Sequence, residues 1–434
     1  MEKCLVTALS HEGRGIIKAE GKKTVFVDFA LLGEEITYET YATHAKFDEA
    51  KTISVRHPSD KRITPLCPYF GVCGGCTLQH MSHDEQIRIK QNTLLEHLKH
   101  QANLVPKRIL KPVIGPLWHY RHKARLSVAQ NGQKRQIGFK QYRSHKIAPI
   151  EQCLVLDKSV DCRALTQLLN NLSSSLSISS LDIAVGNEGT AFILHHSPPL
   201  TDSDQRQIEK FCQIHSCQFY SQTHGRSSIA KIYPKDGQEF LTYTLQDLCF
   251  RFHPADFTQI NPAINQQMVE QALDLLELTP SDHVLDLYCG IGNFSLPIAQ
   301  KAGFVTGVEG VEVMVKQAQL NARLNQINNT KFFTADLSKN TTSWPLESYT
   351  KLLVDPPRTG TNMKLIIALN IPFIIYISCD TATLARDAKA LAQNGYTLDA
   401  AGVMDMFPHT KHIESIAVFK AFNTGTPEKL SLKY

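Results

Sequence analysis

The feature that most constrains the fold is a series of short apolar runs in the last third of the chain, separated by segments long enough for a helix. The runs are Val284–Leu287, Phe304–Val308, Lys331–Thr334, Lys351–Val354, Phe373–Ile377 and Ile416–Phe419. Strands that are apolar along their whole length are buried on both faces, and strands that alternate with helices predict a largely parallel sheet covered on both sides. The expected fold class is therefore α/β.

The first run leads into a glycine turn, in the sequence Val284-Leu-Asp-Leu-Tyr-Cys-Gly-Ile-Gly-Asn-Phe294. Gly290 and Gly292 let the backbone approach a ligand closely, and ligands of open α/β sheets bind beyond the carboxyl ends of the strands. The spacing differs from Gly-x-Gly-x-x-Gly, which disfavours a pyrophosphate site. Glu309 closes the next run and suits a ribose diol, because a carboxylate accepts from both hydroxyls. The layout resembles the S-adenosylmethionine-binding, Rossmann-like sheet of class I methyltransferases.

The sequence after the later runs indicates the reaction. Val354-Asp-Pro-Pro-Arg-Thr-Gly360 lacks the aromatic residue with which amine methyltransferases usually stack on a base. Tyr376-Ile-Ser-Cys-Asp380 places Cys379 at the same edge of the sheet as the cofactor. Uracil C5 is too weak a nucleophile to take a methyl group unaided, but a thiolate that adds to C6 makes C5 reactive. A carboxylate must then remove the C5 proton, and Glu414, just before the last run, is the expected base.

Together with Phe257-Thr-Gln-Ile-Asn261, these motifs resemble those of the RNA uracil-C5 methyltransferases, in particular of the members that act on 23S rRNA. The resemblance covers nearly the whole chain and implies that Cys379 is the nucleophile and Glu414 the base. The positions that match the family's cofactor and active-site contacts are Gln259, Tyr288, Asn293, Glu309, Asp336 and Asp355. The implied reaction methylates one uridine of 23S rRNA with S-adenosylmethionine, after the base has flipped out of its stack.

A cysteine cluster precedes this region. The spacing Cys67-x5-Cys73-x2-Cys76 predicts a metal-binding loop, with Cys153 as the best fourth ligand and Cys162 as a weaker candidate. Four thiolates suit either Zn²⁺ or an iron–sulfur cluster, so the residues alone leave the metal open. The family resemblance implies a [4Fe-4S] cluster with a structural role.

Positive charge is concentrated in one stretch. Eleven of the 46 Lys and Arg residues lie between Lys107 and Lys146, where there is no Asp or Glu; the whole chain has a net charge of +5, so the rest carries −6. Cations bind phosphates and aromatic rings stack on unpaired bases, so the stretch predicts an RNA-binding face. Its interleaved aromatic and basic residues are Trp118, Tyr120, Phe139 and Tyr142 with Arg121, Lys123, Arg125, Lys140 and Arg143.

We expect three domains. Residues 1–58 contain short β-rich runs that predict a small β-barrel, and with Gly13-Arg-Gly15 they resemble a TRAM domain, which binds RNA. Residues 59–255 form a central α+β domain with the cysteine loop, the basic stretch and an amphipathic helix at Asp84–His100. Residues 256–434 form the methyltransferase domain.

No apolar run reaches the roughly 18 residues of a membrane span, and no secretory signal is visible. We therefore expect a soluble, cytoplasmic protein without a membrane or an evident protein partner.

Two alternative functions stay open. The same chemistry on tRNA, or on another rRNA uridine, is the close alternative. A protein of another class, a non-catalytic ribosome assembly factor with a four-cysteine metal module, is disfavoured because the thiol, the base and the cofactor acids are all present.

Overall fold

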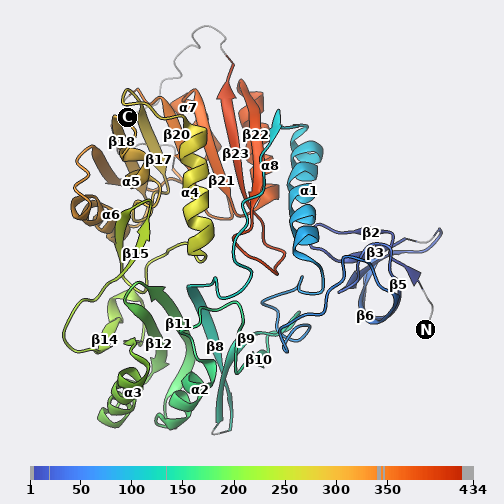
Figure 1. Cartoon of the computed structure of the whole chain (residues 1–434), viewed down its shortest axis with the longest axis vertical. Helices are drawn as coiled ribbons and strands as arrows, with labels where there is room; N and C mark the ends of the chain where they lie inside the picture. The colour runs from blue at the N-terminus through green and yellow to red at the C-terminus, as the bar shows by residue number, and fades with distance from the viewer. Residues whose placement is uncertain (1–3, 19, 133, 340–343, 346–347, 423–434) are drawn as a thin grey trace.

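The chain folds around three large sheets that follow one another in sequence (Figure 1). The structure is a computed structural model that describes residues 4–18, 20–132, 134–339, 344–345 and 348–422. No helix in these ranges is long and apolar enough to cross a membrane.

The C-terminal sheet has eight strands and confirms the α/β prediction. Its order is β19 (Thr330–Thr334), β18 (Phe304–Glu309), β17 (His283–Leu287), β20 (Lys351–Val354), β21 (Phe373–Ser378), β23 (Glu414–Ala421), β22 (Tyr396–Met404) and β7 (Arg108–Ile109). The first five strands are parallel, whereas β23 runs antiparallel to β21 and β22. All six apolar runs are strands, and the sequence analysis missed β22 and β7.

Helices cover both faces of this sheet, which explains why its strands are apolar throughout. Val284 and Leu353 belong to the core under α4, α5 and α6, while their neighbours Leu285 and Leu352 belong to the core under α1, α7 and α8. The helix bounds are Pro262–Leu276 for α4, Ser295–Ala299 for α5, Glu312–Leu324 for α6, His83–Ala102 for α1, Met363–Leu369 for α7 and Thr381–Gln393 for α8.

The central sheet lies below the C-terminal one in Figure 1 and carries two helices, α2 (Cys162–Asn171) and α3 (Asp202–His215), over one core. Its strand order is β10 (Ile147–Pro149), β9 (Lys134–Lys140), β8 (Lys123–Asn131), β11 (Ser177–Gly186), β12 (Gly189–Ser197), β13 (Gln218–Gln222) and β14 (Ala230–Tyr233). One helical turn, η1 (Arg226–Ser228), lies between β13 and β14, and a hairpin of β15 (Leu241–Leu245) and β16 (Leu248–Phe252) follows β14 in sequence.

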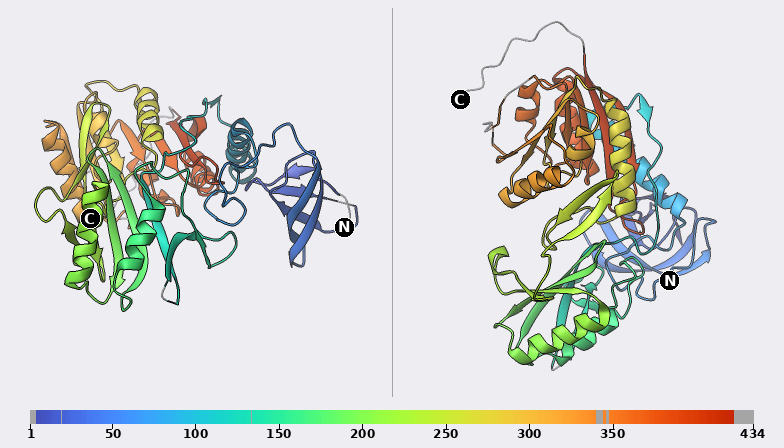
Figure 2. Two further views of the ribbon diagram at one scale, coloured as in Figure 1. Left: turned by 60° about the horizontal axis from the view of Figure 1, so that its bottom comes forward. Right: turned by 60° about the vertical axis from the view of Figure 1, so that its left-hand side comes forward.

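The N-terminal sheet has six strands and projects to one side of the molecule (Figures 1 and 2). Its order is β1 (Cys4–Leu5), β5 (Glu35–Thr43), β6 (Phe47–His57), β4 (Thr24–Asp28), β3 (Gly15–Ile17) and β2 (Ala8–Leu9). The β-rich character expected for this region is therefore present, while its assignment as a TRAM domain stays a prediction.

The structure places two segments of residues 59–255 against the C-terminal sheet. Leu94 and Leu98 of α1 join the core that also contains α8, and β7 extends the sheet next to β22. The β15–β16 hairpin packs on α6, where the Asn321 and Asn325 side chains accept from the backbone N–H groups of Arg251 and Cys249. The amphipathic pattern of α1 predicts an apolar face correctly, but it does not say which sheet covers that face.

A buried ion pair fastens α1 to the C-terminal domain. Lys90 Nζ lies 2.7 Å from Asp405 Oδ1, and both side chains are at most 1% exposed. His83 Nε2 lies 2.8 Å from the other carboxylate oxygen. Burial alone would raise the pKa of Asp405, but the hydrogen bond from His83 and the charge of Lys90 lower it. Asp405 is therefore the charged centre that joins α1 to the loop after β22.

Substitution of Lys90 should make the protein less stable to unfolding. Lys90→Met leaves the Asp405 charge buried with His83 as its remaining partner, so the free energy of unfolding should fall by about 3 kcal/mol. Urea denaturation measures the change. The matched control is Lys316→Met, which breaks an exposed i,i+4 pair with Glu312 on α6 and should leave stability unchanged. Equal effects of the two substitutions would contradict this role of the pair.

Candidate active site and cysteine cavity

A cavity of about 670 Å³ lies at the carboxyl ends of the parallel strands. Three of the six predicted cofactor residues line it: Tyr288 after β17, Glu309 at the end of β18 and Asp336 after β19. Gly310, Leu337, Ser338 and the loop 357–362 that follows β20 form the rest of its wall. Because the strands are parallel, residues far apart in sequence meet at this one edge.

The glycine turn and Glu309 shape one side of the cavity. Gly290 and Gly292 have φ of +56° and +95°, a backbone region that favours glycine. Glu309 Oε2 accepts from the Gly290 N–H at 3.2 Å, and Oε1 accepts from the Val311 N–H at 2.9 Å. Each oxygen keeps a further lone pair. The carboxylate is therefore fixed in position while still able to accept from a ligand hydroxyl.

The other three predicted cofactor residues are not among the residues that line this cavity. Asn293 exchanges amide hydrogen bonds of 2.9 Å with Asn265, and its oxygen also accepts from the Tyr243 hydroxyl. Gln259 Nε2 lies 3.5 Å from Asp355 Oδ2, directly after β20. The structure thus pairs Gln259 with Asp355 beside the cavity and uses Asn293 to hold α4 against the glycine turn.

Cys379 and Glu414 are brought together by an antiparallel strand register. Ser378, the last residue of β21, pairs with Ser415 of β23, and one further step along this register sets Cys379 opposite Glu414. Cys379 is partly exposed, whereas Glu414 is only 5% exposed. The sequence analysis expected this proximity, and the reversed direction of β23 is its structural cause.

Two carboxyl groups, one thiol and one guanidinium share this small region. Burial raises the pKa of Asp355 to about 7 and that of Cys379 to about 11, where the charge of Glu414 adds to the effect. Burial and the charge of Asp355 raise the pKa of Glu414 well above its ordinary value, and Arg358 opposes the rise. Asp355 and Arg358 come from the same motif after β20. The sequence analysis quoted Arg358 but gave it no role.

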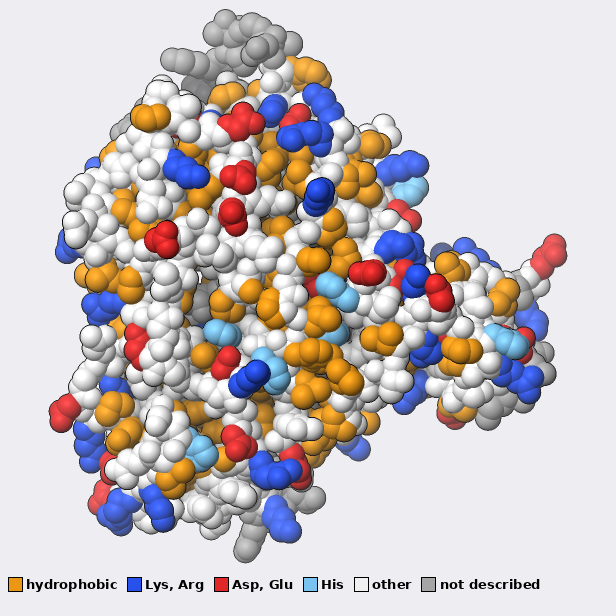
Figure 3. Space-filling model, viewed as in Figure 1, with side chains coloured by type: hydrophobic (Ala, Val, Ile, Leu, Met, Phe, Trp, Pro, Cys, Tyr) orange, Lys and Arg blue, Asp and Glu red, His pale blue; other side chains and the backbone are white. Residues whose placement is uncertain are grey.

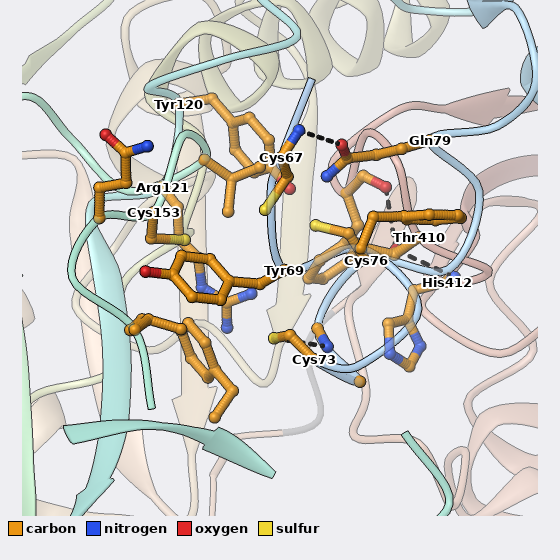
Figure 4. Close-up of a pocket in the computed structure, with 18 of the residues that line it drawn as sticks. Cys67, Tyr69, Cys73, Cys76, Gln79, Tyr120, Arg121, Cys153, Thr410 and His412 are labelled. Atoms are coloured by element: carbon orange, nitrogen blue, oxygen red, sulfur yellow. Dashed lines mark hydrogen bonds between the residues drawn. The ribbon is translucent and has the colours of Figure 1, made fainter. Parts of the chain in front are cut away.

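The four predicted metal ligands line a second cavity, of about 290 Å³. Figure 4 shows the sulfur atoms of Cys67, Cys73, Cys76 and Cys153 directed toward a common space. Cys162 instead lies in the core of the central domain. Within the described part of the chain, no three His, Cys, Asp or Glu side chains are grouped as ligands of a single metal ion.

This cysteine cavity adjoins the catalytic candidates. Arg358, Phe407, Thr410 and His412 form part of its wall. Arg358 Nη2 donates to His412 Nδ1 at 3.2 Å. Because Arg358 also acts on the pKa values of Cys379 and Glu414, its guanidinium is common to both sites.

Much of the basic stretch is already paired within the protein. Arg125 binds Asp182 through two hydrogen bonds, of 2.5 and 2.7 Å, and Arg143 lies 3.2 Å from Asp28 in the N-terminal sheet. Lys123 donates to the carbonyl of Pro254. The buried Arg135 donates to the backbone carbonyls of Leu169, Leu172, Ser173 and Leu176.

The aromatic residues of the stretch are also engaged in packing. Trp118 stacks on His409 with ring centroids 4.0 Å apart, Tyr120 is buried, and the Tyr142 hydroxyl donates to Asp28. On the face drawn in Figure 3, Lys and Arg side chains are scattered rather than gathered in one patch. Carboxylates and carbonyls distant in sequence thus engage these side chains within the protein, and RNA binding by the basic stretch stays a prediction.

Comparison with known proteins identifies the family. The model of the tRNA (uracil-5-)-methyltransferase family matches residues 82–421. Two relatives named 23S rRNA (uracil(1939)-C(5))-methyltransferase RlmD, from Alcanivorax borkumensis and Legionella pneumophila, are 43% and 42% identical over 96% of this chain and 96% of their own length. The crystal structure of Pyrococcus abyssi tRNA (uracil-54, C5)-methyltransferase has the same fold, with a TM-score of 0.73 at 23% identity, and covers 96% of this chain and 100% of its own. The chain therefore belongs to the tRNA (uracil-5-)-methyltransferase family and is an RNA uracil-C5 methyltransferase.

Proposed function

We propose that this enzyme methylates C5 of one uridine in 23S rRNA, with S-adenosylmethionine as methyl donor. The register that sets Cys379 opposite Glu414 carries the mechanism, because C5 methylation needs a nucleophile and a base at one uracil ring. The names of the 41–43% identical relatives support 23S rRNA as the substrate.

The cavity at the strand ends suits the methyl donor. Glu309 would hold the ribose hydroxyls, while Tyr288 and Asp336 would border the rest of the nucleoside. Bound there, S-adenosylmethionine supplies an electrophilic methyl group on a positively charged sulfur. The adjacent Gln259 and Asp355 offer an amide donor and a carboxyl acceptor to the polar edge of uracil, which carries carbonyl oxygens and one N–H.

The proposed reaction divides between two side chains of the protein. The Cys379 thiol loses its proton to solvent, and the thiolate adds to uracil C6, which moves the electron pair of the C5–C6 bond onto C5. C5 then takes the methyl group and carries both this group and its original hydrogen. Glu414 removes that hydrogen as a proton, the C5–C6 double bond re-forms and the thiolate leaves. Cys379 therefore acts first and Glu414 last.

We also propose a [4Fe-4S] cluster in the cysteine cavity. The support is that four cysteines line one cavity, because four thiolates are the ligand set of a [4Fe-4S] cluster. Burial raises the pKa of Cys76 to about 12, so these thiols would give up their protons when the metal binds. The cluster would join the loop of Cys67–Cys76 to Cys153, which supports a structural role.

Where the enzyme acts and how it reaches the base are further parts of the proposal. We propose a cytoplasmic enzyme whose target uridine flips out of its stack to reach Cys379, since the thiol is only partly exposed. An assembly factor without catalytic activity would not need a buried carboxylate opposite a thiol, because an unneeded buried acid destabilises the fold.

Two substitutions should stop the reaction at different steps. Cys379→Ala should form no covalent bond to RNA and transfer no methyl group. Glu414→Gln keeps the thiol but cannot take the C5 proton, so a methylated protein–RNA adduct should accumulate. Denaturing gels with radioactive methyl donor measure both outcomes. Turnover by Glu414→Gln at the parent rate would exclude Glu414 as the base, and a labelled adduct in Cys379→Ala would exclude Cys379 as the nucleophile.

The substrate is tested in cells. Deleting the gene should abolish 5-methyluridine at one position of 23S rRNA, and expressing the protein again should restore it, whereas expressing Cys379→Ala should not. Mass spectrometry of purified rRNA and tRNA gives the measurement. Loss of the modified base from tRNA alone would contradict the choice of 23S rRNA and leave the C5 chemistry unaffected.

The cluster has a spectroscopic test. Protein purified without oxygen should be brown and contain about four irons per chain, as a [4Fe-4S] cluster requires. Cys73→Ser should bleach the colour and lower the stability, because a ligand site absent from the unfolded chain adds its binding free energy to folding. Cys162→Ser, which lies outside the cavity, should stay brown. A colourless protein with one zinc per chain would refute the cluster.

A further inference from the structure

The loop between β22 and Glu414, residues 405–413, is held from several sides. Two consecutive backbone N–H groups, of Thr77 and Leu78, donate to the His409 carbonyl at 2.9 Å each. The His409 N–H donates to Gln86 Oε1 at 2.9 Å, and the Trp118 ring stacks on the His409 ring. The loop is thus a rigid support that leads directly into the catalytic strand.

Tyr120 supplies a separate anchor from the wall of the cysteine cavity. Its ring lines this cavity, and its hydroxyl donates to the Pro408 carbonyl at 3.1 Å. The side chain is 3% exposed, and burial raises its pKa, so the hydroxyl stays protonated and donates. The sequence analysis assigned Tyr120 to the RNA face, where a buried side chain has no access to bases.

The loop touches the active site at its other end. His412 accepts from Arg358, and Glu414 follows two residues later as the first residue of β23. Cys379 is held differently: the Ser378 hydroxyl accepts from the Asp380 N–H at 3.1 Å, and Asp380 caps α8 through the Thr383 N–H. The sheet also holds both ends of this site, because Glu414 pairs with Met404 of β22 and the Ser415 hydroxyl donates to the Ser378 carbonyl at 3.1 Å. The 405–413 loop leads directly into Glu414 and not into Cys379, so a shift of the loop acts first on Glu414.

We propose that Tyr120 is a positioning residue that sets Glu414 for removal of the C5 proton, by tying the wall of the cysteine cavity to the loop that precedes the catalytic strand. The inference rests on the proposed function, because it assigns Tyr120 to the half of the reaction in which Glu414 acts. Loss of its hydroxyl should slow adduct resolution and leave thiol addition and methyl transfer unchanged.

The Tyr120→Phe substitution tests this positioning role in the full-length enzyme, with the metal content that it has after purification. The rate of adduct resolution should fall about threefold to tenfold, the usual effect of one lost hydrogen bond. The fraction of protein present as methylated RNA adduct at steady state should rise accordingly. The single-turnover rate of methyl transfer, RNA affinity and iron content should match the parent.

Tyr396→Phe is the matched control. Tyr396 is also 3% exposed, and its hydroxyl donates to the backbone carbonyl of Ile371 at 2.9 Å, away from the loop. Both substitutions should lower the melting temperature by similar amounts, but only Tyr120→Phe should accumulate adduct. A second variant, Trp118→Leu, removes the stacking on His409 and should show the same defect, so the proposal stays testable if Tyr120→Phe folds poorly.

The results of these variants distinguish a failure of the positioning role of Tyr120 from a failure of the proposed chemistry. If Glu414→Gln traps an adduct while Tyr120→Phe and Trp118→Leu resolve theirs at the rate of Tyr396→Phe, the positioning role is refuted and the chemistry stands. If Tyr120→Phe slows methyl transfer and resolution equally, its role is general packing and the proposal is again refuted. If Glu414→Gln forms no adduct at all, the proposed chemistry itself fails.

Discussion

The buried pair of Lys90 and Asp405 is the interaction on which the arrangement of the active site depends. A charge taken out of water destabilises the fold unless a partner lies against it, so this pair forms only when α1 is docked in one place. Asp405 opens the loop that leads to Glu414, and Lys90 also donates to the Phe407 carbonyl in that loop. A helix that precedes the whole central sheet in sequence therefore fixes the approach to the proposed catalytic base.

The antiparallel direction of β23 allows two catalytic groups to meet in a way that a purely parallel sheet does not. The proposed chemistry needs a thiol and a carboxylate at one small ring, and neighbouring parallel strands would deliver their ends from the same direction, each followed by its own loop. Because β23 runs antiparallel to β21, the end of one strand meets the beginning of the other, and the last pair, Ser378 with Ser415, leaves Cys379 and Glu414 as the next residues on either side. The hydrogen bonds of the sheet thus bring the two groups together, and the 405–413 loop that leads into β23 sets the final position of Glu414.

The sequence predicts local features of this protein better than its long-range partners. The apolar runs, the glycine turn after Val284–Leu287, the helix of α1 and the loop of Cys67, Cys73 and Cys76 all follow from patterns within a few dozen residues, and the structure has each of them. Cys153, which lies 77 residues after Cys76, completes the group of four cysteines. The ion pairs of the basic stretch do not follow from the sequence, because the carboxylate partners of Arg143 and Arg125, Asp28 and Asp182, lie far away along the chain. The dual position of Arg358, at the cysteine cavity and at the active site, likewise arises from packing that no local pattern encodes.

The charges at the site also favour the proposed order of steps, in which Cys379 adds to uracil before Glu414 removes the C5 proton. Glu414 is buried and Cys379 partly buried, so negative charges on the two oppose one another, and a further carboxyl group, Asp355, adds to the repulsion. A neutral Glu414 therefore favours the thiolate needed for addition. Once the sulfur is bonded to uracil C6 it carries no charge, so Glu414 can lose its proton to solvent and then take the C5 hydrogen. The burial that raises the pKa of Glu414 makes its carboxylate a stronger base at that step, and the charge of Arg358 opposes this rise.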